Sequence, residues 1–346
     1  MNFMKGSIFA IGIILLIVIG SFGTSATILK KDECDCSNII IKNVETDIDN
    51  FDYGLGLLVL PSEDPDLPDP IMLPGNAPSS WDWRDVNGKN YLTPIRDQAE
   101  CGSCYAFGII AAMETIYSYQ NDVHDPTLDL SEQFVVSCSQ SIVWFNRGCC
   151  GGLMGETLSF LKSKGTPLES CFPYAAVDSK GRDAYDCPFG FPSNDPVKCT
   201  DRCPEWENQV IKINNYHTLL TRESIKNAIS TYGPVVVGFR VYEDFKDYTG
   251  GIYEHEYGNF AGNHMVAIIG YDDIQEYWIC KNSWGMSWGE DGFFRISYGE
   301  CGIDAPGSCA YFESCTVSQV YANPFVYHLF KRFPILHIFF KELMIL

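Results

Sequence analysis

The order of two hydrophobic patterns along the chain most constrains how it can fold. Segments with apolar residues at helical spacing come first, and short apolar or alternating runs bounded by turns come afterwards. Helices followed by strands, instead of the two in alternation, indicate an α+β chain with two lobes. The 346 residues suffice for one large domain or two small ones. A cleft between the lobes is then the expected place for a binding site.

Eight segments carry this predicted secondary structure. The longest helix begins at Cys104, and Phe107, Ile110 and Tyr117 follow at the spacing of one helix face. Ser131 suits the N-cap of the second helix. A glycine with a proline close behind it ends each of the last two helices. The predicted helices span 104–120, 131–136, 153–164 and 223–232, and the predicted strands span 235–239, 265–271, 276–281 and 292–297.

Residues 1–26 are predicted to be a secretory signal peptide. Lys5 supplies a positive charge, and the apolar run from Ile8 to Ile19 is short for a membrane span. Small residues at 24–26 suit cleavage, while an uncleaved N-terminal anchor is the alternative. Export also fits the fifteen cysteines, because disulfides persist in oxidising compartments. We therefore expect a secreted or extracellular protein.

The charge of the chain argues against one class of partner. The formal net charge is −20, and no basic block occurs beyond isolated pairs. Nucleic-acid-binding proteins usually carry a basic patch or stripe, so we do not expect a nucleic acid partner. The acidity instead suits an extracellular protein that must stay in solution.

Three short stretches, far apart in the chain, carry the residue types of nucleophilic catalysis. The first contains Gln98, Cys101 and Cys104, the second His264 in front of an apolar strand, and the third Asn282. Cysteine is a good nucleophile as the thiolate, which a helix N-terminus favours. A strand holds an imidazole within reach of a proton, and an amide can orient its ring. A redox or zinc-binding cysteine pair remains a weaker alternative, because no βαβ setting is evident.

These stretches resemble the papain family of cysteine peptidases over about residues 79–310. The resemblance implies a papain-like two-lobe α+β fold, with a helical lobe, an antiparallel β-barrel-like lobe and the active site in the cleft between them. It implies Cys104 as the nucleophile, His264 as the base and Asn282 as the amide that orients the base. It also implies that Gln98 and the Cys104 backbone N–H form the oxyanion hole.

The resemblance extends to substrate contacts and to one disulfide. Cys101 is expected to pair with Cys149. Trp284 is expected to shield the bond between the base and its orienting amide. The wall of the pocket for the substrate side chain two residues before the scissile bond is expected to be apolar. The residues implied in substrate binding are Gly151, Gly152, Leu153, Met154, Gly238, Met265 and Trp284.

Several residues depart from the family pattern. Tyr105 replaces the tryptophan that usually follows the nucleophile. Cys150 stands where the family has another residue type, and either forms an extra disulfide or stays free. Cys301 lacks its usual partner, and either pairs with Cys309 or Cys315 or stays free. The Cys199-Thr-Asp-Arg-Cys203 spacing resembles a metal-binding motif. Disulfides are favoured instead, because the protein is expected in an oxidising compartment.

Both ends of the chain lie outside the resemblance. Residues 27–78 form a Pro-rich acidic propeptide or linker, because closely spaced prolines from 61 to 70 exclude regular structure. This segment lacks the long helix of the family propeptide, so it is either an inhibitor of the catalytic domain, residues 79–316, or a plain spacer. The apolar tail, residues 317–346, is interrupted by Pro334 and either contacts a membrane surface or packs on the domain.

The residues and the resemblance together predict a secreted cysteine endopeptidase that acts on proteins or peptides through a Cys-His-Asn acyl-enzyme mechanism. The region from 171 to 203 lacks the paired histidines of the occluding loop of cathepsin B, which favours endopeptidase action. No cofactor and no metal is expected. A catalytically silent binding homologue and a Cys-His acyl transferase that ligates peptides are the alternatives.

Overall fold

The computed structural model describes residues 54–140, 146–183, 186–187 and 192–318. The predicted signal peptide, the first part of the segment 27–78 and nearly all of the predicted tail lie outside the described residues. Within the described ranges, no helix combines the length and the apolar character that a membrane crossing requires.

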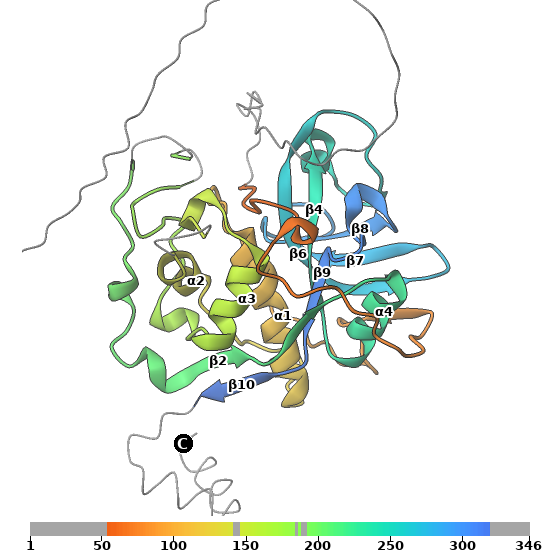
Figure 1. The fold of residues 1–346 in the computed structure, drawn as a ribbon, viewed down its shortest axis with the longest axis horizontal. Helices are drawn as coiled ribbons and strands as arrows, with labels where there is room; N and C mark the ends of the chain where they lie inside the picture. The colour runs from red at the N-terminus through yellow and green to blue at the C-terminus, as the bar shows by residue number, and fades with distance from the viewer. Residues whose placement is uncertain (1–53, 141–145, 184–185, 188–191, 319–346) are drawn as a thin grey trace, which may run out of the picture. The chain divides into compact units, whose positions relative to one another are not determined.

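Three helices gather on one side of the described chain and form the helical lobe (Figure 1). The central helix α1 (Cys104–Gln120) has buried residues around its whole circumference, as expected for a helix inside a core. Helix α2 (Glu132–Cys138) begins after Ser131, whose hydroxyl accepts the backbone N–H of Phe134, as the sequence predicts. Helix α3 (Met154–Ser163) packs beside α1 and α2. All three match predicted helices to within a few residues.

The β lobe is built on an eight-stranded sheet, counted over the described residues. Its strand order is β3-β9-β4-β6-β7-β8-β5, with β1 also paired to β6. Every pairing is antiparallel except that of β5 with β8. The strands are β1 (Ser80–Asp82), β3 (Tyr216–Thr218), β4 (Val235–Tyr242), β5 (Ile252–Tyr253), β6 (Phe260–Asp272), β7 (Tyr277–Lys281), β8 (Phe293–Ser297) and β9 (Cys309–Phe312).

Two smaller elements complete the two lobes. Helix α4 (Arg222–Thr231), capped by Thr221, contacts β4 and β6 of the sheet. Strands β2 (Val210–Ile213) and β10 (Cys315–Ser318) pair with each other and contact the helical lobe (Figure 1). The predicted α+β fold with a helical lobe and a mostly antiparallel sheet is therefore confirmed.

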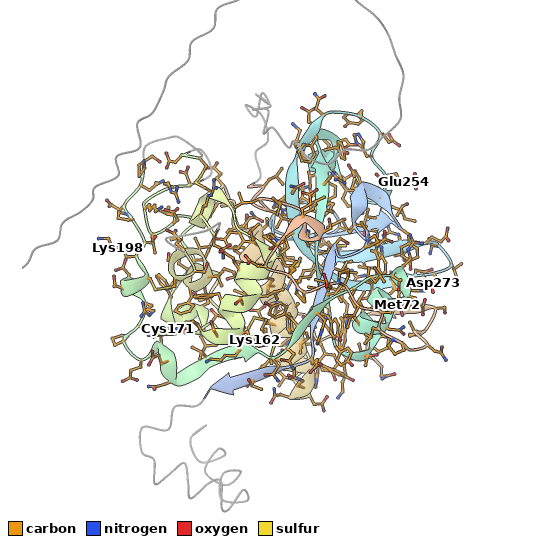
Figure 2. The ribbon with its side chains drawn as sticks, in the orientation of Figure 1. Met72, Lys162, Cys171, Lys198, Glu254 and Asp273 are labelled. Atoms are coloured by element: carbon orange, nitrogen blue, oxygen red, sulfur yellow. A yellow bond between two sulfur atoms is a disulfide. The ribbon has the colours of Figure 1, made fainter. Side chains whose placement is uncertain are left out.

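The two lobes meet where α1 lies against β6. A Cβ on Gly108 would lie 3.1 Å from Met265 Cγ and 3.3 Å from the backbone nitrogen of Val266, so a larger residue would require its neighbours in β6 to shift. Side chains fill the space on both sides of this contact, with Cys171 and Lys198 on the helical lobe and Glu254 and Asp273 on the β lobe (Figure 2). The helix that carries Cys104 is thereby held against the strand that carries His264.

Four disulfides, among the cysteines that the structure describes, lie in the helical lobe and its loops. Cys101 is joined to Cys149, as the resemblance implies. Cys150 forms the extra disulfide that the sequence left open, and the two cysteines with metal-like spacing each form a separate disulfide. Cys301 is a free thiol, as are its two proposed partners. The further pairs are Cys138–Cys199, Cys150–Cys187 and Cys171–Cys203.

Candidate active site

The thiol of Cys104 stands at the first position of α1, and its surroundings are backbone N–H groups. The N–H groups of Met265 and Gly56 face the sulfur, as do those of Tyr105 and of Cys104 itself. The Cys104 residue is completely buried. Because Met265 directly follows His264 in β6, the structure brings the predicted nucleophile and the predicted base to one place.

The imidazole of His264 is oriented by a single hydrogen bond. Its Nε2 lies 2.8 Å from Oδ1 of Asn282, an atom that can only accept, so Nε2 carries the ring hydrogen. Nδ1 is then an unprotonated acceptor, and among the described residues it has no hydrogen-bond partner. The Trp284 ring lies 4.7 Å from the imidazole, centroid to centroid, and is 2% exposed. This arrangement leaves one imidazole nitrogen available for a proton.

Burial holds both groups in their neutral forms in this state. It raises the pKa of Cys104 to about 11, although the surrounding N–H groups oppose this shift. It lowers the pKa of His264 to about 4, while the bond to Asn282 acts in the opposite direction. Between these two values the thiol keeps its proton and the imidazole has none. In this assembled site, burial therefore favours the neutral thiol over the thiolate.

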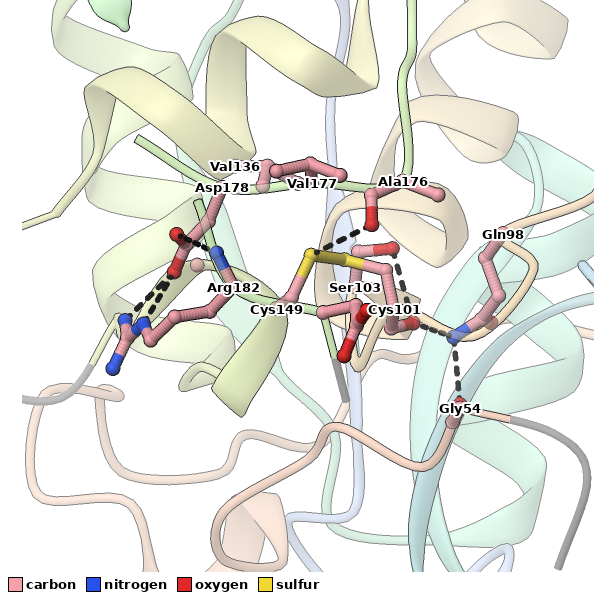
Figure 3. The surroundings of a disulfide bond; sticks show 12 residues. Gly54, Gln98, Cys101, Ser103, Val136, Cys149, Ala176, Val177, Asp178 and Arg182 are labelled. Carbon is pink, nitrogen blue, oxygen red and sulfur yellow. Dashed lines mark hydrogen bonds and ion pairs between the residues drawn. A yellow bond between two sulfur atoms is a disulfide. The ribbon is translucent and has the colours of Figure 1, made fainter. Parts of the chain in front are cut away.

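Gln98 is buried and its side chain is fixed at both ends. Its Oε1 accepts the hydroxyl of Ser283 at 2.6 Å. The carboxamide Nε2 donates to the carbonyl of Gly54 at 2.6 Å and to that of Cys101 at 2.8 Å (Figure 3). The Gly54 carbonyl oxygen thus accepts a hydrogen bond from Gln98, the side chain that is predicted to form the oxyanion hole.

A segment of the predicted propeptide or linker lies in the cleft, and we call residues 54–78 the strap. Leu57 donates its N–H to the carbonyl of Asn263, which precedes His264, at 3.3 Å. On the helical lobe, Gly152 accepts the N–H of Leu58 at 3.1 Å and donates to the carbonyl of Gly56 at 2.8 Å. The strap therefore pairs with the backbone of both lobes, in parallel with Gly152.

The side chain of Leu57 fills the predicted apolar pocket. It belongs to the buried cluster that contains Met154 and Met265. A Cβ on Gly238 would lie 2.5 Å from Cδ2 of Leu57, so the missing side chain makes room for it. Leu153 is buried at the start of α3 but does not belong to that cluster. Met154, Met265 and Gly238 therefore surround the side chain of Leu57.

Two other predicted substrate contacts also face the strap. A Cβ on Gly151 would lie 2.9 Å from a methyl carbon of Leu58, and that glycine has a φ of 100°. A Cβ on Gly152 would lie 2.8 Å from the ring of Tyr105. The hydroxyl of Tyr105 donates to the carbonyl of Gly148 at 3.0 Å. Tyr105 thus packs against the glycine turn and donates a hydrogen bond to it. Because Gly151 and Gly152 have no side chains, their backbone is accessible to an extended chain.

Two contacts of the site were missed from the sequence. Ser283 holds the Gln98 amide, and Tyr174 contacts Ser103 and the Gln98 backbone. Both are ordinary polar contacts with no sequence signature. The segment before residue 79 was predicted to be either an inhibitor or a spacer, and its residues at the site were not named, although glycines at positions 54 and 56, alternating with leucine, are typical of close backbone approach.

Among the residues that the structure describes, no group of three or more His, Cys, Asp or Glu side chains is arranged to hold a metal ion. The pairs Cys138–Cys199 and Cys171–Cys203 use the sulfurs of the metal-like motif in disulfides.

Comparison with known proteins identifies the family. The profile of the papain family cysteine proteases matches residues 77–311. A cathepsin B-like protein, CP3, of Giardia intestinalis is 34% identical over 244 residues, which are 69% of this chain and 76% of that protein. Pro-cathepsin H of Mus musculus is 34% identical over 242 residues, 68% of this chain and 65% of that protein.

A solved structure shares the fold. The digestive procathepsin L2 proteinase from the larval midgut of Tenebrio molitor superposes with a TM-score of 0.56 at 27% sequence identity. The superposition covers 75% of this chain and 78% of that one. The family profile, the relatives and this solved structure all indicate the same family. The chain belongs to the papain family of cysteine proteases.

Proposed function

We propose that this chain is an exported cysteine endopeptidase that cleaves peptide bonds through an acyl-enzyme on Cys104. His264 Nδ1 takes the proton of the Cys104 thiol, the resulting thiolate attacks the peptide carbonyl, and the developing oxyanion accepts bonds from Gln98 Nε2 and the Cys104 N–H. His264 then protonates the leaving amine, and it later takes a proton from the water that hydrolyses the thioester. The observation that carries this mechanism is the 2.8 Å bond from His264 to Asn282, which leaves Nδ1 without a hydrogen-bond partner among the described residues.

The strap keeps the enzyme latent until it is removed. A productive substrate places in the pocket the residue two positions before the scissile bond. The strap places the Gly54 carbonyl at Gln98 and puts Leu57, three residues later, in the pocket. Its backbone therefore runs opposite to that of a substrate, and the sulfur of Cys104 faces the N–H of Gly56. The strap is positioned to occupy the site without being cut.

Further contacts hold the strap along its length. The carboxylate of Asp64 accepts the N–H of Gly155 at 2.8 Å, in the first turn of α3, where the N-cap residue Leu153 makes no side-chain cap. Farther along, Thr218 donates to the carbonyl of Pro68 at 2.6 Å, and the N–H of Leu73 donates to the hydroxyl of Ser224 at 2.9 Å. These contacts support a role of the strap beyond that of a spacer.

Export and substrate class are parts of the same proposal. The four disulfides support folding in an oxidising compartment. Pairing of the strap with both cleft walls supports binding of an extended peptide by the same backbone groups.

The full chain, activated by limited proteolysis that removes the strap, tests this function. We expect a peptidyl epoxide to label Cys104 with one equivalent and to stop all turnover of a peptide library. Mass spectra should show peptides ending in free carboxylates, because water takes the acyl group. Absence of labelling and turnover would favour a silent binding homologue. Mainly amide products when an amine is added at low concentration would favour an acyl transferase.

The pocket occupied by Leu57 should set substrate preference. An aliphatic or aromatic side chain two residues before the scissile bond gains roughly 1.5–3 kcal/mol on burial there. We expect a cleavage profile that prefers Leu over Arg or Glu at this position by at least about tenfold. Gly238→Ala should shift the preference toward smaller side chains, because its Cβ would overlap with a bound leucine. A profile dominated by Arg or Glu would contradict an apolar pocket.

A further inference from the structure

We infer that Tyr174 is a positioning residue that holds both donors of the oxyanion hole in place. Its hydroxyl lies 2.7 Å from Oγ of Ser103, the residue before the nucleophile. The same hydroxyl donates to the backbone carbonyl of Gln98 at 2.9 Å. One side chain thus contacts the hydroxyl of the residue before Cys104 and the backbone carbonyl of Gln98, one contact beside each predicted donor. This inference rests on the proposed function and adds a residue that the family resemblance did not assign.

The direction of these two bonds follows from the acceptors. The Gln98 carbonyl can only accept, so the single hydrogen of Tyr174 points to it. Ser103 therefore donates its hydrogen to the tyrosine oxygen, which forms a relay from Ser103 through Tyr174 to Gln98. A hydrogen bond from Ser103 also opposes the rise that burial causes in the pKa of Tyr174. The relay is complete only with a hydroxyl at position 174.

The relay occupies a side chain that would otherwise cap α1. Ser103 is the N-cap of α1, and serine at this position usually accepts an N–H from the first turn. Here its hydroxyl makes no such bond, and it is turned toward Tyr174 instead. Consequently Ser103 is held by a partner outside the helix, and so is the peptide that carries the Cys104 N–H.

Tyr174 is itself held firmly. Its ring packs edge-on against Phe107 of α1, with centroids 4.9 Å apart. Its backbone N–H donates to the Glu169 carboxylate at 2.6 Å. The disulfide between Cys171 and Cys203 fixes the loop on which it lies. A group anchored in this way can position others, because an oxyanion hole must be preorganised to stabilise the charge that develops.

The test compares Tyr174→Phe with wild type in the full chain, after activation by limited proteolysis and normalisation by active-site titration. Phenylalanine keeps the contact with Phe107 and removes both hydrogen bonds. We expect kcat to fall about tenfold, since loss of a whole oxyanion donor costs about 10²–10³. KM should change by less than about twofold, because ground-state binding is untouched. The affinity for a peptide aldehyde, whose adduct carries an oxyanion, should fall with kcat.

Alkylation by iodoacetamide forms no oxyanion, so its rate should stay within about twofold of wild type. In a Gln98→Ala background, Tyr174→Phe should cost less than about threefold, because one donor that it positions is already gone. Tyr248→Phe is the matched control: its hydroxyl also donates to a backbone carbonyl, that of Gly251, and accepts one bond, from the N–H of Arg295. It should keep wild-type kcat.

Each outcome tests either the positioning role of Tyr174 or the proposed peptidase function. Unchanged kcat and aldehyde affinity in Tyr174→Phe would overturn the positioning role, as would an equal loss in the presence and absence of Gln98. Should Tyr174→Phe fail to fold, Ser103→Ala breaks the other end of the relay, and the same split between aldehyde affinity and alkylation is expected. A wild-type chain without any peptide turnover would count against the proposed function instead.

Discussion

Cys104→Ala is expected to reduce peptide turnover to the background rate, a loss of about 10⁴-fold or more. In the proposed mechanism the sulfur is the atom that forms the acyl-enzyme, so its removal leaves no nucleophile for that step. Cys104→Ser should be almost as inactive, because a hydroxyl ionises far less readily than a thiol. Initial rates with a fluorogenic peptide measure this loss. Wild type and both variants are treated with the same added protease, so that the strap is removed from all three chains.

The fold should survive these changes. Serine matches the volume of the buried thiol, so circular dichroism and the thermal midpoint should stay close to those of wild type. Cys301→Ser is the matched control, because Cys301 is also a free cysteine but is only partly buried and lies outside the site. It should keep full turnover. Measurable peptidase activity in Cys104→Ala, at a level above that of an inactivated wild-type sample, would remove the proposed mechanism.

Gly56→Val should release the strap and switch on the full-length chain without proteolysis. A Cβ at this position would lie 1.8 Å from the carbonyl oxygen of Gly102, and backbone atoms cannot move aside as a flexible side chain can. Leu57→Asp should act in the same direction, because it places a charge in the apolar pocket. We expect turnover to rise at least about tenfold before any cleavage of the chain, because substrate can enter the cleft once the strap has left it.

Thiol reactivity provides a second measurement of the same release. With the strap bound, burial raises the pKa of Cys104 to about 11, so little thiolate exists at neutral pH. Solvent access removes this desolvation and lowers the pKa, so iodoacetamide should alkylate Gly56→Val faster than wild type at pH 7. Glu63→Ala changes an exposed strap residue and should leave both rates unchanged. Equal turnover and equal alkylation in all these chains would mean that the strap is only a spacer.

The secondary structure around the site was accessible from the sequence because it depends on local patterns. Helix α1 has the bounds that apolar spacing predicts, and Ser131 caps α2 as expected. The strands β4, β6, β7 and β8 were found because each has four or more apolar or alternating residues between turns. The shorter strands β1, β3, β5 and β9, and the pair β2 and β10, were not predicted, because segments of two to four residues form through their partners.

The residue types of the candidate site were also readable. Gln98, Cys104, His264 and Asn282 stand in motifs whose order and spacing pointed to one another, and the fold places them together. Their roles stay predictions that the variants above examine. The spacing of Cys150, Cys199 and Cys203, by contrast, left several pairings open. Only the approach of their loops decided which sulfurs meet, since cysteines separated by 32 to 61 residues have no local signal for a partner.

By itself, then, the sequence determined the α+β class, the predicted catalytic residues and the family, because each of these depends on residue type and short-range periodicity. Tertiary structure alone decided that residues 54–58 lie in the cleft and that Tyr174 joins Ser103 to Gln98. Composition suggested only an extended acidic segment before residue 79. Its path depends on the close backbone approach of Gly54 to Cys101 and of Gly56 to Gly102. The alternating glycines indicate a close backbone approach, but the segment that they approach is distant in the sequence, so only the tertiary structure identifies it.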